Sequence, residues 1–276
     1  MATSFMAKTV QCGSVRNCIE DIKDIIADGN FILAPEGITL LAMDPSSTVL
    51  VNLKLEAENF EVYACEKRQV IGVNMSDLFK IIKTMTNDDT LTLFIETDNP
   101  NYLFIRIENQ EKHKVTTYKF NLMDLNEDEV SLPPAHFESV INMPSVDFQK
   151  ITRDMHNIGD IIEIKSIGQQ LILSCKGDFA SQETVIGNNV SQLSAAAQES
   201  LEASGSAGAA ADNQTIVQGF YTLKYLTQFS KCSNLSSQCE LYLKNDYPLI
   251  LAYKVANLGT IRLMLAPHVE DQKIAV

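Results

Sequence analysis

Apolar and polar residues alternate in short segments along most of the chain, which is the pattern of strands with one buried face. These segments are rich in β-branched and aromatic residues, and most end at Gly, Asn, Asp or Pro. The pattern predicts strands at residues 49–55, 90–95, 102–107, 115–122, 161–165, 171–174, 239–243 and 249–253.

Four segments instead carry apolar residues three and four positions apart, which is the helical period. They cover residues 14–27, 76–86, 145–158 and 220–231. Ser14 and Ser145 are the predicted N-caps of the first and third helices. Because the order of one helix, several strands, one helix and several strands then repeats, the sequence predicts an α+β fold with two similar halves.

The predicted boundary between the halves is an acidic, proline-containing connector at residues 122–138. Four acids are followed there by Pro133 and Pro134, and proline stiffens a linker. We therefore expect an N-terminal domain at 1–121 and a C-terminal domain at 139–276. An Ala/Ser/Gly-rich stretch at about 188–214 has little to bury and is predicted to be a surface loop.

The composition fits an intracellular globular protein. The chain has 276 residues, 45% of them hydrophobic, and a formal net charge of −13. Its six cysteines form no CxxC pair and lie at no zinc-ligand spacing from histidine, so buried thiols in a reducing compartment are expected. No signal peptide and no membrane-spanning apolar run are predicted.

Basic residues lie on the polar faces of all four predicted helices, although the molecule is acidic overall. A solvated helix face often carries lysine, and Glu20, Asp147 and Asp154 interrupt the pattern. Four basic faces in so acidic a chain nevertheless favour a surface that contacts phosphates without reading sequence. The candidate DNA-facing residues are Arg16, Lys23, Lys80, Lys83, Lys150, Arg153, His156, Lys224 and Lys231.

No motif for catalysis, a metal or a cofactor stands out. The four histidines have no nearby nucleophile motif, and the chain lacks GxSxG, Walker, GxGxxG and HExxH patterns. We therefore expect a protein that is not an enzyme and needs no cofactor.

Motifs spread from about residue 5 to residue 271 resemble the proliferating cell nuclear antigen family of DNA sliding clamps. No single motif decides this, but their order and spacing together are specific. The clearest segments are LAMDPS (41–46), IGVNM (71–75), NQEK (109–112), LMDL (122–125), MPS (143–145), RDMHNIGD (153–160), Pro248-Leu249 and LAP (265–267).

The resemblance implies two domains of DNA-clamp fold in each subunit of a closed three-subunit ring. Antiparallel sheets would lie outside, and four short helices of each subunit would line a central channel for double-stranded DNA. Edge strands at 115–122 and 181–186 would pair between subunits, although each could equally be an ordinary edge within one subunit. The implied subunit-interface residues are Tyr118, Lys119, Glu183 and Val185.

Family members also bind partner peptides with aliphatic and aromatic anchors in an apolar pocket beside the connector. The matching positions here are Met43, Ser47, Val130, Leu132, Pro248, Met264, Leu265 and Ala266. Ordinary core packing is the alternative for Met43 and Leu265. Ser47 and Met264 replace the His and Tyr usual in animal members, and Gly168 stands where many members have a modified lysine.

The implied partners are DNA polymerase, the clamp loader, nucleases and ligases with clamp-binding peptides, and two further copies of the chain. The implied location is the nucleus, or a viral replication compartment if a virus encodes the chain. A subunit of a heterotrimeric clamp is the alternative function, and an enzyme on a duplicated α+β fold has no motif to support it.

Overall fold

The computed structural model describes residues 2–125, 135–168, 170–187, 191–192 and 216–268. By its internal contacts the chain divides into two compact units. Unit 1 consists of Met1–Val130, Asn234–Ser236 and Tyr253–Arg262, and unit 2 consists of Ser131–Ser233, Ser237–Ala252 and Leu263–Val276. Strands β17 (Leu249–Val255) and β18 (Gly259–Leu265) therefore contribute residues to both units.

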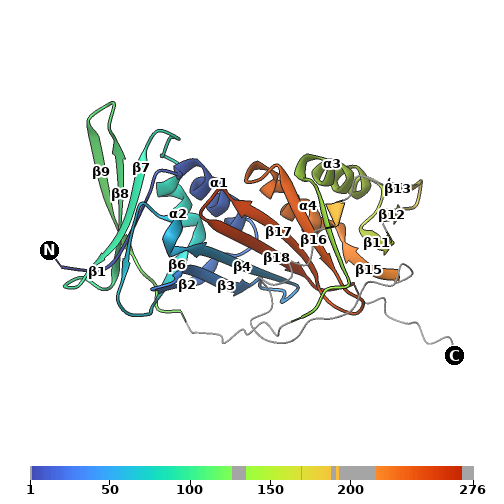
Figure 1. The fold of residues 1–276 in the computed structure, drawn as a ribbon, viewed down its shortest axis with the longest axis horizontal. Coiled ribbons are helices and arrows are strands. Elements are labelled where there is room, and N and C mark those ends of the chain that lie inside the picture. Colours follow the sequence, from blue (N-terminus) through green and yellow to red (C-terminus); the bar gives the residue numbers. More distant parts are fainter. Residues whose placement is uncertain (1, 126–134, 169, 188–190, 193–215, 269–276) are drawn as a thin grey trace. The chain divides into compact units, whose positions relative to one another are not determined.

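In its described part, unit 1 contains two antiparallel sheets and two α-helices (Figure 1). One sheet has the strand order β5-β1-β7-β8-β9, and in the other β6-β2-β3-β4 are neighbours. At the end of β4, the Glu56 N–H donates a 2.9 Å hydrogen bond to the Leu258 carbonyl. The strands are β1 (Thr3–Thr9), β2 (Asp28–Ala34), β3 (Gly37–Met43), β4 (Val49–Glu56), β5 (Val62–Cys65), β6 (Gln69–Asn74), β7 (Thr90–Glu96), β8 (Tyr102–Asn109) and β9 (Lys114–Asn121).

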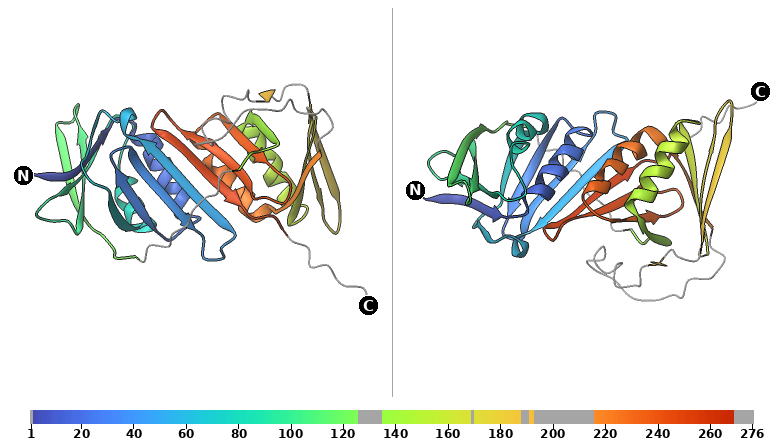
Figure 2. Two further views of the ribbon diagram at one scale, coloured as in Figure 1. Left: turned by 60° about the horizontal axis from the view of Figure 1, so that its bottom comes forward. Right: turned by 90° about the horizontal axis from the view of Figure 1, so that it is seen from above.

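Helices α1 (Cys12–Lys23) and α2 (Met75–Ile82) pack against each other in unit 1 (Figure 2). Their apolar stripes bury Ile19 and Leu78 among the side chains of both sheets. Alternation explains the strands: Phe5 and Ala7 of β1 are buried, and Met6 between them is half-exposed. Unit 1 thus has one apolar core between helices and sheets, and a short 3₁₀ turn at Ala57–Asn59.

Unit 2 repeats this arrangement in its described residues. A four-stranded sheet has the order β13-β12-β11-β15, and β14-β10-β16 are neighbours in a second sheet. Helices α3 (Ser145–His156) and α4 (Leu223–Phe229) pack together, and a 3₁₀ segment at Ser230–Asn234 follows α4. The strands are β10 (Ser139–Pro144), β11 (Ile161–Ile167), β12 (Gln170–Lys176), β13 (Ser181–Gly187), β14 (Ser191–Gln192), β15 (Ile216–Thr222) and β16 (Gln238–Leu243).

The eight strands expected from alternation are all present, most of them one or more residues longer than expected. The predicted α+β fold with two similar halves is confirmed. The predicted domain bounds at residues 121/122 and 138/139 stay a prediction. The predicted loop at 188–214 lies outside the described residues, except for Ser191–Gln192, which pair with β10.

Several predicted helix ends need correction. The second helix begins at Met75 and ends at Ile82, four residues before its predicted end. The first helix begins at Cys12 and ends at Lys23, so Ser14 lies inside it and is not its N-cap. Ser145 is the first residue of α3 rather than its cap, because its N–H donates to the Ser237 carbonyl across the sheet. Phe220 lies in β15, where it pairs with Glu163 of β11, and the fourth helix starts only at Leu223.

The cysteines bear out a simpler expectation. All six cysteines are buried, and none of them forms a disulfide. No helix in the described part of the chain has the length and apolar character needed to cross a membrane. Within the same residues, no group of three or more His, Cys, Asp or Glu side chains is arranged to hold a metal ion.

Candidate functional sites

The basic residues of unit 1 gather on the adjoining helices α1 and α2. The Lys23 ammonium lies 4.9 Å from the centroid of the Phe79 ring, so it links the two helices. Lys23 also pairs with Asp24 at 2.7 Å, and Lys80 pairs with Asp77 at 2.7 Å. Both pairs are at least partly open to solvent, where such a bond is weak enough to be exchanged for a phosphate.

Arg16 and Lys83 differ in how they are held. The Arg16 guanidinium is half-buried and donates to the Met85 carbonyl at 2.6 Å and to Asn87 Oδ1 at 3.4 Å. Lys83 is exposed just after the end of α2. Arg16 therefore ties α1 to the segment after α2, whereas Lys83 points its charge into solvent.

The basic residues of unit 2 lie on α3, α4 and the following 3₁₀ segment. Lys150, Arg153 and His156 are exposed and three positions apart, so they share one face of α3. Lys224 is exposed and lies 5.7 Å from the Tyr225 ring centroid, and Lys231 is exposed in the 3₁₀ segment. Among the described residues, Lys150, Arg153 and Lys224 take part in no salt bridge.

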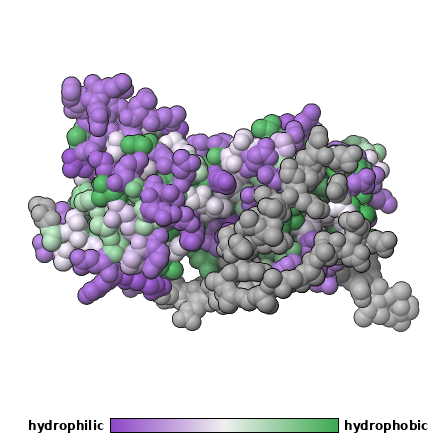
Figure 3. Space-filling model, viewed as in Figure 1, coloured by the Kyte–Doolittle hydropathy of each residue, from purple (hydrophilic) through white to green (hydrophobic). Residues whose placement is uncertain are grey.

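The candidate subunit contacts lie on two edge strands. Among the described strands, β9 ends the five-stranded sheet and β13 ends the four-stranded sheet. Val115 is 56% exposed and Val185 is 52% exposed, so both edges carry apolar side chains in contact with water. Lys119 places its ammonium 3.8 Å from the Tyr102 ring centroid, and the surface over β8 and β9 is mainly hydrophilic (Figure 3).

A turn stabilised by Asp44 carries two candidate pocket residues of unit 1. The Asp44 carboxylate accepts hydrogen bonds from the Thr48 N–H at 2.8 Å, the Val49 N–H at 2.7 Å and the Ser46 N–H and hydroxyl. Burial alone would raise the Asp44 pKa, but these hydrogen bonds together lower it below its ordinary value. The turn holds Ser47 in the left-handed region, at φ 55°.

The structure places Met43 at the surface and Leu265 in the core. Met43 is 48% exposed, so core packing does not account for it. Leu265 is fully buried and Met264 is 7% exposed, which makes both part of the unit 2 core. Pro248 and Ala266 are half-exposed, and Val130 and Leu132 lie outside the described residues.

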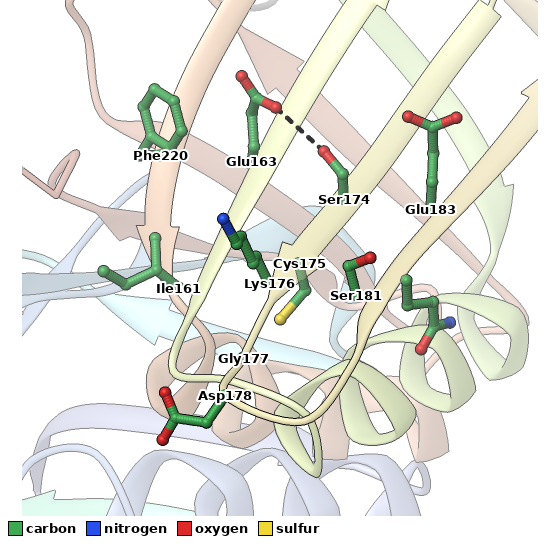
Figure 4. A pocket seen from close by; sticks show the side chains of 11 residues that line it. Ile161, Glu163, Ser174, Cys175, Lys176, Gly177, Asp178, Ser181, Glu183 and Phe220 are labelled. Atoms are coloured by element: carbon green, nitrogen blue, oxygen red, sulfur yellow. Dashed lines mark hydrogen bonds between the residues drawn. The ribbon is translucent and has the colours of Figure 1, made fainter.

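A groove that the sequence analysis missed runs over the outer face of the four-stranded sheet in unit 2 (Figure 4). Its volume is about 620 Å³, and Ile161, Glu163 and Phe220 are among its lining residues. Glu163 accepts hydrogen bonds from the Ser174 hydroxyl at 3.0 Å and from the Gln218 amide, and pairs with Lys165 at 2.9 Å. The strand register creates this cluster, so no local motif could have revealed it.

Comparisons with known proteins agree on one family. The models of the N-terminal and C-terminal domains of proliferating cell nuclear antigen match residues 4–130 and 131–268. A viral relative, "Probable DNA polymerase sliding clamp 1" of Paramecium bursaria Chlorella virus 1, is 32% identical over 267 residues, which cover 95% of this chain and 96% of the relative. A crystal structure of proliferating cellular nuclear antigen from Entamoeba histolytica matches with a TM-score of 0.83 and 24% identity, over 97% of this chain and all of that one.

The two units of sheets and paired helices therefore have the DNA-clamp fold. The chain belongs to the proliferating cell nuclear antigen family.

Proposed function

We propose that this protein is a DNA sliding clamp, a ring that encircles double-stranded DNA and tethers DNA polymerase to it. The observation that carries the proposal is the placement of exposed cations along α2, α3 and α4, and of the half-buried Arg16 and Lys23 on α1, in a chain whose net charge is −13. The family and the viral relative support the same role. The proposed role is mechanical and involves no catalysis.

The chemistry of the helices suits sliding. Duplex DNA carries roughly one negative charge per 1.7 Å of its axis, and lysine or arginine neutralises it without reading bases. Such contacts pass from one phosphate to the next at little cost because successive phosphates are alike. Acidic residues elsewhere on the chain would repel DNA from other surfaces.

The proposed ring is a homotrimer closed by pairing β9 of one subunit with β13 of the next. Tyr118 and Lys119 would lie on one side of this contact, and Glu183 and Val185 on the other. Pairing would satisfy the backbone donors and acceptors of two open edges, which otherwise favour aggregation. The 95% coverage by one viral clamp favours this over a specialised heterotrimer subunit.

Partner proteins are proposed to bind through short peptides with apolar anchors. The pocket would comprise Met43, Ser47, Val130, Leu132, Pro248, Met264 and Ala266, with the buried Leu265 supporting Met264 and Ala266 from the core. It would lie beside a connector at 122–138 that joins domains 1–121 and 139–276. The exposed Met43 is the side chain best suited to contact a ligand directly. The proposed partners are DNA polymerase, the clamp loader, nucleases and ligases, in the nucleus or a viral replication compartment.

The mass of the purified protein in solution tests this proposal. Size-exclusion chromatography with light scattering is expected to give three times the 30.6 kDa of one chain. Addition of the protein to primed circular DNA with polymerase and clamp loader is expected to lengthen the products of single binding events. A chain that stays monomeric at micromolar concentration, or that leaves product length unchanged, would contradict it.

A further inference from the structure

The start of the connector lies against the outer edge of β6 in unit 1. The Met123 N–H donates a 2.8 Å hydrogen bond to the Gly72 carbonyl, and these two residues form an isolated antiparallel bridge. One residue earlier, the Leu122 N–H donates to the Asn101 carbonyl at 3.0 Å. Because β6 is the last strand of its sheet in the described residues, Met123 takes the place of a further strand there.

Gly72 leaves no room for a side chain at this point. A Cβ atom on Gly72 would lie 2.4 Å from the Met123 carbonyl oxygen and 2.9 Å from Leu125 Cγ. The first of these atoms belongs to the backbone, so the chain itself would have to move. Gly72 is not among the glycines with positive φ, so its backbone conformation is open to any residue. A glycine is needed here because the connector approaches so closely, and not because of the turn chemistry of the strand.

We propose that Gly72 is a positioning residue for partner binding, which holds the first residues of the connector in a fixed place on β6. The half-buried Leu125 completes this contact by covering the space above Gly72. The inference rests on the proposed function, because it assigns the connector a part in binding partner peptides. Val130 and Leu132, the proposed pocket residues of the connector, follow Leu125 by five and seven positions.

The contact with β6 matters for binding because only five positions along the chain separate Leu125 from Val130. Five residues span at most about 18 Å, so a chain anchored at Leu125 has a limited reach. A released connector would occupy the binding arrangement only part of the time. The apparent dissociation constant rises in inverse proportion to that fraction, and the loss appears in the association rate. If Gly72→Ala lowers the fraction to about one tenth, peptide affinity falls about ten-fold.

Hydrogen exchange tests the contact without any ligand. In Gly72→Ala, the Met123 amide is expected to exchange much faster, while the amides of β1 and β7 keep their protection. Gly13→Ala is the matched control, because its new methyl group would meet only the side-chain amide of Asn87. Unchanged exchange at Met123 in Gly72→Ala would overturn the proposed contact.

A synthetic peptide with aliphatic and aromatic anchors tests the consequence for binding. Stopped-flow measurements are expected to show slower association to Gly72→Ala and an unchanged dissociation rate, with Gly13→Ala behaving as wild type. Faster exchange combined with unchanged peptide affinity would overturn the positioning role. If wild-type protein binds no such peptide, the proposed pocket is wrong, whereas hydrogen exchange still decides whether the contact exists.

Leu125→Ala removes the covering side chain without adding a clash, so it serves even if Gly72→Ala fails to fold. It is expected to weaken peptide binding less than Gly72→Ala does. The double variant is expected to bind like Gly72→Ala alone, since both changes release the same segment. Additive losses of affinity in the double variant would count against the proposal. If Gly72→Ala is unfolded, peptide binding by Leu125→Ala that equals wild type would count against it as well.

Discussion

Reversing four basic residues on the helices is the sharpest test of how the protein meets DNA. The variant carries Lys80→Glu, Lys83→Glu, Arg153→Glu and Lys224→Glu, two changes in each unit. All four side chains are exposed. Their replacement should leave the folded units intact, because none is part of the apolar core.

Counterion release sets the size of the expected effect. Each cation that contacts a phosphate of duplex DNA adds about 0.9 to the slope of log affinity against log salt. Lys80 already pairs with Asp77 at 2.7 Å, while the other three form no salt bridge among the described residues. Each subunit that faces the duplex should therefore lose between about 2.7 and about 3.6 from the slope, depending on whether Lys80 contributes.

The assay measures binding of a short linear duplex by fluorescence anisotropy over a tenfold range of NaCl concentration. The control variant carries Lys67→Glu, Lys112→Glu, Lys176→Glu and Lys254→Glu, which are exposed lysines outside the four helices. We expect the helix variant to lose most of its salt dependence and its stimulation of polymerase, and to keep its oligomeric state. Equal losses in both variants, or an unchanged slope in the helix variant, would refute the assignment of these helices to DNA.

Three further outcomes are expected. Leu132→Ala combined with Met264→Ala should weaken binding of the anchor peptide at least about ten-fold in calorimetry. Val146→Ala, at an exposed position, serves as the control. Unchanged affinity of the double variant would show that these residues do not form the peptide pocket. Asp44→Asn should destabilise the protein at neutral pH by about 1–3 kcal/mol in urea unfolding. Because the folded state lowers the Asp44 pKa, the stability that the ionised carboxylate contributes is complete above the ordinary pKa of 3.8 and is lost as the pH falls below it. A stability difference between wild type and variant that persists in strong acid would contradict this reasoning. Burial raises the pKa of Cys12 to about 11 and that of Cys239 to about 12. The native protein should therefore react slowly with iodoacetamide at mildly alkaline pH, and the unfolded protein quickly. Rapid reaction of the native thiols would argue against their burial.

Local patterns predicted the elements better than their ends. Alternation located strands such as β8 because one face of each strand is buried, and the buried face is visible in the sequence. Helix starts depended on partners far along the chain. Ser145 begins α3 because its N–H bonds to Ser237, and Phe220 stays extended because Glu163 pairs with it.

Some features of the candidate sites could be predicted from local patterns, and others depended on contacts between distant residues. The basic helix faces followed from spacing alone, and the exposure of Lys83 and Lys150 agrees with that spacing. The sequence could not reveal that the Arg16 guanidinium donates a hydrogen bond to the Met85 carbonyl, or that the Gly72 carbonyl accepts one from the Met123 N–H. Both contacts join residues more than fifty positions apart, which only the folded chain brings together.

The division of β17 and β18 between the two units has a consequence for how the protein is made. Unit 1 includes Tyr253–Arg262, which a ribosome adds more than a hundred residues after Val130. At typical elongation speeds of roughly 5–20 residues per second, the N-terminal part waits on the order of ten seconds for its last strands. During that interval Leu53 and Leu55 of β4 lack Val255, which lines the same apolar cavity in the finished chain. We therefore expect fragments that end at the connector to expose apolar surface and to be poorly soluble.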